Sequence, residues 1–232
     1  QYNEKTLWSG GPQPDSTDYN GGNYQDRYKV LAEIRKALEE GNRQKAKQLA
    51  ERNLVGPNNA QYGRYLSFGD IFMVFNNQKK GLENVTDYRR DLDISEAITT
   101  TSYTQDGTSF KRETFSSYPD DVTVTHLTKK GDKTLDFTLW NSLTEDLIAN
   151  GDYSWENSKY KQGTVSVDSN GILLKGTVKD NGLKFASYLG IKTDGQVTAQ
   201  DGYLTVTGAS YATLLLSAKT NFAQNPKTNY RK

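Results

Sequence analysis

After Pro57, apolar residues recur at every second position through most of the sequence, which is the period of a β-strand with one buried face. In 183–191, for example, Leu, Phe, Ser, Leu and Ile stand at alternate positions and Lys, Ala, Tyr and Gly fall between them. Asn-Gly and Asp-Gly dipeptides, which accept the positive φ angles of tight hairpin turns, separate such runs. These dipeptides are Asp106-Gly107, Asn150-Gly151, Asn170-Gly171, Asn181-Gly182, Asp194-Gly195 and Asp201-Gly202.

The pattern predicts roughly ten to twelve antiparallel strands. We place them at 68–75, 85–93, 97–105, 108–117, 121–129, 134–141, 163–168, 171–179, 183–193, 196–199, 202–207 and 210–219. No helical pattern lies between these runs, and a parallel sheet with crossover helices is therefore disfavoured. The fold class is predicted to be mainly β, with two packed antiparallel sheets.

An earlier stretch, at about 27–55, has the period of a helix instead. Its apolar positions recur every three to four residues, as Val30/Leu31, Ile34 and Leu38, and then as Ala46, Leu49, Ala50 and Leu54. Gly41 stands where a C-terminal cap belongs, Asn42 can cap a second helix, and Gly56-Pro57 ends it. The sequence predicts a short helical hairpin inserted at the periphery of the sheets.

Charge and composition exclude several classes of function. A net charge of +1 provides no basic field for nucleic acid. The chain has no Cys and one His, which excludes disulfides and thiolate nucleophiles and nearly excludes Cys/His zinc sites. The longest apolar run, 71–75, is far below the ~20 residues of a membrane-spanning helix. We expect no cofactor, no metal, no nucleic-acid partner and no membrane segment.

The residues that could carry catalysis form no recognisable set. His126 has no nucleophile and orienting carboxylate placed for it, so a structural or solvent-facing role is favoured. A glycosidase needs two carboxyl groups about 5 to 10 Å apart, and nothing in the sequence selects such a pair. The candidates are Asp87, Asp91, Asp93, Asp120, Asp121, Glu145 and Asp146.

Aromatic residues make up 11% of the chain and could stack on sugar rings, although Tyr is also a common strand residue. For Trp140 and Trp155 we favour packing. Trp8 differs, because Ser9-Gly10-Gly11-Pro12 follows it at once and places it in a stiff loop. An exposed Trp in such a loop is typical of a contact site.

The run Asn3-Glu4-Lys5-Thr6-Leu7-Trp8-Ser9-Gly10-Gly11-Pro12 resembles the N-terminal motif of glycoside hydrolase family 95, the inverting α-L-fucosidases. Further motifs follow in the order of that family and extend the resemblance over nearly the whole chain. They are Gly56-Pro57, Phe68-Gly69-Asp70, Tyr88-Arg89-Arg90-Asp91-Leu92-Asp93, Arg112-Glu113 with Phe115, Tyr118-Pro119-Asp120 and Thr220-Asn221-Phe222.

The resemblance implies a single antiparallel β-supersandwich domain over 1–232, the non-catalytic N-terminal part of a bacterial α-L-fucosidase. In that family the catalytic residues lie in a later helical barrel, so no catalytic residue carries over and the chain alone is expected to be inactive. The implied partners are that barrel and, through the longer enzyme, a fucosylated glycan.

The implied interdomain or pocket-rim loop comprises Asn3, Glu4, Trp8, Ser9, Gly10, Gly11 and Pro12. Two alternatives stay open at this stage. The first is an autonomous carbohydrate-binding module. The second is a related sandwich from a phosphorylase-like enzyme, which fits the architecture but not the Trp8 motif.

Overall fold

A computed structural model of the chain describes residues 2–10, 26–54, 63–75, 84–142 and 160–232. The chain divides into two compact units. One comprises 1–9 together with 65–232, and the other comprises 10–64. Each unit is described by itself below.

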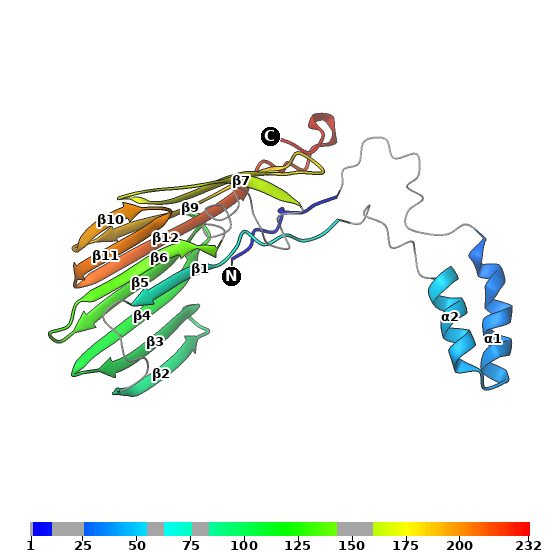
Figure 1. Cartoon of the computed structure of the whole chain (residues 1–232), viewed down its shortest axis with the longest axis horizontal. Coiled ribbons are helices and arrows are strands. Elements are labelled where there is room, and N and C mark those ends of the chain that lie inside the picture. The colour runs from blue at the N-terminus through cyan, green and yellow to red at the C-terminus, as the bar shows by residue number, and fades with distance from the viewer. Residues whose placement is uncertain (1, 11–25, 55–62, 76–83, 143–159) are drawn as a thin grey trace. The chain divides into compact units, whose positions relative to one another are not determined.

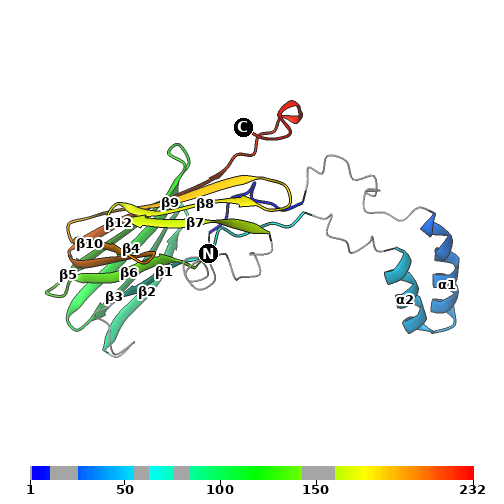
Figure 2. The same cartoon turned by 45° about the horizontal axis from the view of Figure 1, so that its top comes forward.

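The first unit is built from antiparallel strands in two sheets (Figures 1 and 2). The strands are β1 (Ile71–Phe75), β2 (Val85–Asp93), β3 (Ile98–Gln105), β4 (Thr108–Ser117), β5 (Val122–Lys130), β6 (Leu135–Asn141), β7 (Lys161–Asp168), β8 (Gly171–Val178), β9 (Lys184–Thr193), β10 (Gln196–Gln200), β11 (Tyr203–Ala209) and β12 (Tyr211–Thr220). The small sheet has the order β1-β6-β11-β10, and the large sheet has the order β2-β3-β4-β5-β12-β9-β8-β7.

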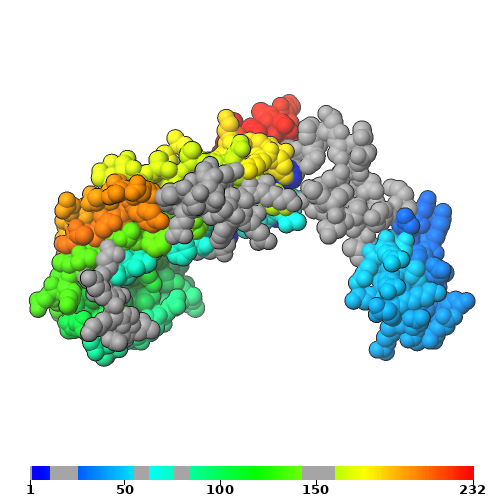
Figure 3. Space-filling model, in the orientation of Figure 1, coloured from blue at the N-terminus to red at the C-terminus, as the bar shows by residue number. Residues whose placement is uncertain are grey.

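The two sheets pack through alternate residues of their strands, because successive side chains of a strand point to opposite faces. Leu135, Phe137 and Leu139 of β6 are all buried and pack against Leu127 and Leu214 of the large sheet. In Figure 3 the orange surface of β10 and β11 adjoins the green surface of the earlier strands, as expected from the pairing of β11 with β6. The predicted fold class, two antiparallel sheets with a helical hairpin near the N-terminus, is confirmed; one further 3-10 turn, η3 (Pro226–Thr228), follows β12.

All twelve predicted strands occur among the described residues, with ends that shift by a few residues. The largest shift is at β1, which begins at Ile71 rather than at residue 68. Residues 66–69 pair instead with the N-terminal segment: the amide of Tyr2 donates to the carbonyl of Gly69 at 3.0 Å, and the amide of Leu66 donates to that of Leu7 at 2.9 Å.

Two of the six predicted turn dipeptides close two-residue hairpins. Asp106 and Gly107 have φ angles of 48° and 76°, and Asp201 and Gly202 have φ angles of 51° and 84°, as type I′ turns require. Gly195 serves a different purpose, because it lies where the chain passes from the large sheet to the small one. A Cβ there would lie 2.6 Å from the carbonyl oxygen of Thr207, so only glycine fits. Asn150-Gly151 lies outside the described residues.

The second unit contains the predicted helical hairpin, with η1 (Arg27–Val30), α1 (Leu31–Glu39) and α2 (Arg43–Asn53). Gly41 follows α1 with a φ of 73°, and the Asn42 side chain accepts a hydrogen bond from the Lys45 amide, so both predicted caps are present. The predicted apolar stripe was partly wrong. Leu31 and Leu38 are exposed, whereas the small Ala37 and Ala46 are buried with Ile34. Close approach of two short helices favours these small side chains.

Among the described residues, no helix is both long enough and apolar enough to cross a membrane.

Candidate functional site

In the predicted interdomain or pocket-rim loop, Trp8 lies on the surface of the sandwich unit with 45% of its area exposed. Its ring packs beside that of Tyr65, with centroids 5.2 Å apart, and Tyr65 is 47% exposed. Its Nε1 donates to the carbonyl of Lys5 at 2.9 Å, and its own carbonyl accepts from the Asn181 side chain at 3.0 Å. The two rings form an exposed aromatic pair on an anchored backbone.

The neighbours of Trp8 explain why it points outward. Leu7 and Ser9 on either side are buried, with 0% and 2% of their area exposed. Residues 7–9 alternate like a strand, and Trp8 forms an isolated bridge with Tyr65. Burial of the flanking residues therefore holds the indole on the outer side. The predicted role of Trp8 in a domain contact stays a prediction.

The rest of this loop is held by local hydrogen bonds. Glu4 accepts from the amide of Thr6 at 2.9 Å and from its hydroxyl, while Asn3 is exposed. The Thr6 hydroxyl also bonds that of Thr220. The structure thus joins the N-terminal motif to the Thr220-Asn221-Phe222 motif, a contact that the sequence did not predict. Gly10 has a φ of 89°, and Gly11 and Pro12 lie outside the described residues.

The candidate catalytic residues that the structure describes have structural partners. Asp91 accepts from Arg89 Nε at 2.5 Å. Asp93 accepts from the backbone amides of Ser95 and Glu96 and from the Ser95 hydroxyl, which lowers its pKa. His126 Nδ1 lies 2.8 Å from the Thr213 hydroxyl on the outer face of the large sheet.

Three further carboxylates have similar partners. Asp87 accepts from the Thr86 hydroxyl at 3.1 Å. Asp120 accepts from the Ser117 hydroxyl at 2.5 Å, and Asp121 pairs with Lys219 at 2.5 Å. Glu145 and Asp146 lie outside the described residues. Within the described ranges, no group of three or more His, Cys, Asp or Glu side chains is arranged to hold a metal ion.

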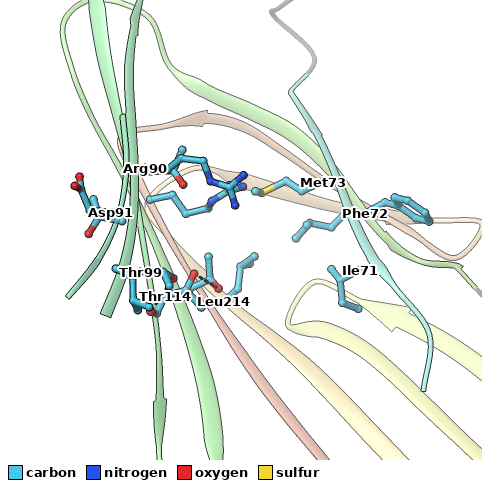
Figure 4. Close-up of a pocket in the computed structure, with 14 residues that line it drawn as sticks. Ile71, Phe72, Met73, Arg90, Asp91, Thr99, Thr114 and Leu214 are labelled. Carbon is cyan, nitrogen blue, oxygen red and sulfur yellow. Dashed lines mark hydrogen bonds between the residues drawn. The ribbon is translucent and has the colours of Figure 1, made fainter. Parts of the chain in front are cut away.

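A cavity of about 770 Å³ lies between β1 and the inner face of the large sheet at β2 to β4 (Figure 4). One wall is apolar and is formed by Ile71 and Met73 of β1 and Leu139 of β6. The other wall carries threonines at inward positions, with the hydroxyls of Thr114 and Thr125 3.0 Å apart. A sandwich interior is usually apolar on both walls, which makes the polar wall unusual.

Two arginines share this polar wall. In the strand register, Arg90 lies opposite Thr101 and Thr101 lies opposite Arg112. The three residues therefore form one row across β2, β3 and β4. The row continues to Leu127, which is buried in the core, and it therefore faces inward. Figure 4 shows the Arg90 guanidinium directed toward Met73, whereas the Asp91 carboxylate points away from the cavity.

Neither inward guanidinium has a hydrogen bond or an ion pair with the described part of the chain. Arg112 is half-buried and Arg90 is exposed at the mouth of the cavity. Asp91 is the one acidic residue among the described lining residues, and its carboxylate is engaged by Arg89 on the outer face. We call the inner face around Arg90, Thr101, Arg112 and Thr114 the open region.

The inner face at β8 and β9 is covered instead. Leu7, Leu66 and Phe68 pack on it in one buried cluster. The other members of this cluster, which we call the closed region, are Leu174, Val178, Leu183 and Phe185. Phe68 lies 5.6 Å from the Tyr2 ring and 5.5 Å from the Phe185 ring, measured between centroids. Apolar side chains from the N-terminal segment thus take the place of a facing strand.

Two titratable groups lie at the closed region, the buried Lys161 and the half-buried Tyr2. Lys161 is fully buried; its Nζ donates to the Ser67 carbonyl and lies 5.8 Å from the centre of the Phe185 ring. Burial lowers the pKa of Lys161 to about 8. Burial also raises the pKa of Tyr2 to about 12, although its hydroxyl bonds the side chains of Ser187 and Asn141 at 2.7 and 2.8 Å.

Sequence reasoning missed the open region. Its signal was present, because Arg112 stands in strand alternation with Phe110 and Thr114, so all three share one face. The alternation alone does not tell which face of β4 points inward. The inward face is identified by the pairing of β4 with β5, which places Arg112 opposite the buried Leu127.

Comparisons of the sequence with known proteins indicate the glycoside hydrolase class. Residues 1–225 match the family described as glycosyl hydrolase family 65, N-terminal domain. Over 95% of its length the chain is 26% identical to alpha-L-fucosidase 2 of Arabidopsis thaliana, and over 61% of its length it is 30% identical to probable alpha-fucosidase A of Aspergillus niger.

The chain spans only 26% and 17% of the length of these two relatives. Among solved structures, a putative kojibiose phosphorylase from the human microbiome matches 72% of the chain at a TM-score of 0.48 and 11% identity, with 24% of that protein covered.

Proposed function

Because the chain belongs to the family of glycosyl hydrolase family 65 N-terminal domains, we propose that it is the non-catalytic N-terminal domain of an α-L-fucosidase. The match confirms the expected class, a glycoside hydrolase N-terminal domain, while family 95 and a bacterial origin stay predictions. In this proposal a separate catalytic domain hydrolyses α-1,2-linked fucosides, and this domain braces it.

One observation carries the proposal. Almost the whole chain aligns with the plant fucosidase, yet it spans only 26% of the length of that protein. The described carboxylates support the non-catalytic role, because those with assigned partners act in turns and surface ion pairs. No pair of them is set apart by a perturbed environment of the kind that a general acid and base require.

The exposed pair of Trp8 and Tyr65 supports a contact with the catalytic domain. Both are large and flat, and hydrogen bonds to Lys5 and Asn181 fix the Trp8 backbone and indole before any partner arrives. An anchor that is already ordered loses little conformational entropy on binding. We place the domain contact at this pair.

The test compares the chain with the longer protein that contains it. The longer protein should release fucose from a 2-linked fucosyl-oligosaccharide, and residues 1–232 alone should release none. Turnover that scales with the concentration of purified 1–232, and that is lost when one of its carboxylates is replaced, would refute the non-catalytic role.

A second candidate, an autonomous carbohydrate-binding module, has one observation in its favour. Phe72, Trp140 and Tyr203 form an aromatic row across β1, β6 and β11, with successive centroids 5.3 and 5.6 Å apart. Their neighbours Leu139 and Leu204 face the core, so the row lies on the outer face of the small sheet. Phe72 is 43% exposed and could stack on a sugar ring.

The module hypothesis is tested with residues 1–232 and a fucosylated oligosaccharide. Saturable binding that is lost in Phe72→Ala but kept in Val74→Ala, its outward-facing neighbour on the same strand, would establish a module. Absence of binding by a folded chain would rule out the module and leave the fucosidase domain as the remaining proposal.

A further inference from the structure

The open region holds two positive charges that the described chain does not neutralise. Arg90 and Arg112 face inward between the sheets, and neither has a hydrogen bond or an ion pair with the described residues. Arg89 and Lys111, which point to the outer face of the same strands, are paired with Asp91 and Glu113 at 2.5 and 2.7 Å. On strands β2 to β4, the arginines without a described partner thus both lie on the inward side.

Such an arrangement is costly without a counter-charge. A guanidinium that is half-buried beside an aliphatic wall loses part of its hydration and gains nothing in return. Its planar set of N–H donors matches the two oxygens of a carboxylate, which it can bind with two parallel hydrogen bonds. Arg90 and Arg112 lie two strands apart, about 10 Å between backbones, and both side chains are long enough to meet over Thr101.

We propose that the open region is a binding site for an acidic saccharide, a uronate-containing oligosaccharide whose carboxylate is held by Arg90 and Arg112. The cavity volume of about 770 Å³ fits a di- or trisaccharide. The hydroxyls of Thr99, Thr101 and Thr114 can exchange hydrogen bonds with sugar hydroxyls, while Ile71 and Met73 offer an apolar surface to the C–H face of a pyranose ring.

The site for a carboxylate follows from the cavity alone, and the choice of a saccharide rests on the proposed function. The two can fail separately. The proposed function is tested by turnover in the longer protein, whereas this inference is tested by binding to residues 1–232. An acidic protein segment is the competing occupant, and the test includes it.

The probe is digalacturonate, and its control is the dimethyl ester of the same disaccharide, which has the same shape without the charges. Titration by calorimetry, with ¹H–¹⁵N NMR to locate the site, should give saturable binding of the acid with a Kd below about 1 mM. The ester should bind at least about tenfold more weakly. Shifted amides should cluster at β2, β3 and β4.

Three variants localise the binding. Arg112→Gln and Arg90→Gln should each weaken digalacturonate binding at least about tenfold. Arg89→Gln is the matched control, since it removes the same charge one residue from Arg90 on the opposite face, and it should leave the affinity unchanged. Arg90 is exposed, so its variant should fold even if the half-buried Arg112 proves necessary for folding.

Several outcomes would overturn the proposal. Equal affinity for the acid and the ester would show that the carboxylate is not recognised. Absence of binding at about 10 mM, or equal losses in Arg89→Gln and Arg90→Gln, would rule out the site. Tighter binding of a tetraglutamate peptide than of digalacturonate, with the same dependence on Arg90, would make the occupant an acidic protein segment.

Discussion

The inner face of the large sheet is completed in two different ways. At the closed region, apolar side chains of the N-terminal segment seal β8 and β9, and the Lys161 amine is buried against a carbonyl and a ring. At the open region, threonines and arginines line a cavity, and the charges of Arg90 and Arg112 have no described partner. Both regions place a cation inside the sandwich.

The difference suggests that one part of the sheet stabilises the fold and another part is available for binding. The closed region satisfies its cation internally and excludes water, so its contacts should contribute to the free energy of unfolding. The open region leaves its cations available and its cavity accessible, so its residues should matter little for folding. Four measurements test this division.

The largest change in the free energy of unfolding is expected when a buried side chain of the closed region is shortened. Phe68→Ala removes a fully buried ring between Tyr2 and Phe185 and should lower the free energy of unfolding by about 3 to 5 kcal/mol in urea denaturation. Leu92→Ala, at the open region, removes a side chain that is 62% exposed and should cost less than about 1 kcal/mol. Similar losses at both positions would contradict the division.

The pH dependence of stability should reveal the buried amine. The pKa of Lys161 is about 8 in the folded chain against an ordinary value of 10.5, so between these values the unfolded chain binds more protons. The free energy of unfolding should therefore rise with pH, by about 2 kcal/mol from pH 8 to pH 10. Tyr2, with a pKa of about 12 against 10.0, opposes this rise only above pH 10.

The control for this measurement is Lys161→Met, which keeps the buried stem and removes the amine. Its free energy of unfolding should be flat over the same pH range in urea denaturation. A rise that persists in this variant would assign the titration to another group.

Trp8→Ala should have a smaller effect on the chain alone. The loss of one exposed aromatic pair is worth about 1 kcal/mol in thermal or urea unfolding. In the longer protein, the same substitution should weaken the domain contact or lower fucosidase activity by more than this. A loss of several kcal/mol in residues 1–232, with turnover of the longer protein unchanged, would make Trp8 a core residue.

The smallest effect is expected for Arg112→Met, which keeps the aliphatic stem and removes the unpaired charge. Without ligand, unfolding at low salt should show a gain of about 0.5 kcal/mol, because a partly desolvated charge is removed from an apolar wall. A loss of more than about 1 kcal/mol would show that Arg112 stabilises the fold through a partner.

The strands and the helical hairpin were predictable because their signals are local. Alternation sets the buried face of Leu135, Phe137 and Leu139, and the residues of each hairpin turn lie beside one another in the sequence. The assignment of Leu38 to the buried stripe was wrong, because the choice between Leu38 and Ala37 depends on how closely α1 approaches α2.

The open and closed regions were not predictable by the same reasoning. Arg90 and Arg112 belong to motifs 22 residues apart, and Thr6 meets Thr220 across a separation of 214 residues. Such contacts depend on which strands pair, and alternation carries no information about pairing. The outward position of Trp8 was suggested by its loop, but its partner Tyr65 was not.

The strand order of the large sheet also bears on how the chain can fold. β2 to β5 form one meander of neighbouring hairpins and β7 to β9 form another, and β12, the last strand, lies between them. Each meander can assemble from local contacts, but their union must wait for residues 211–220 and closes loops of many residues, a slow step. On the ribosome, two half-sheets with unpaired edges would persist until β12 emerges, which leaves those edges exposed to mispairing in that interval.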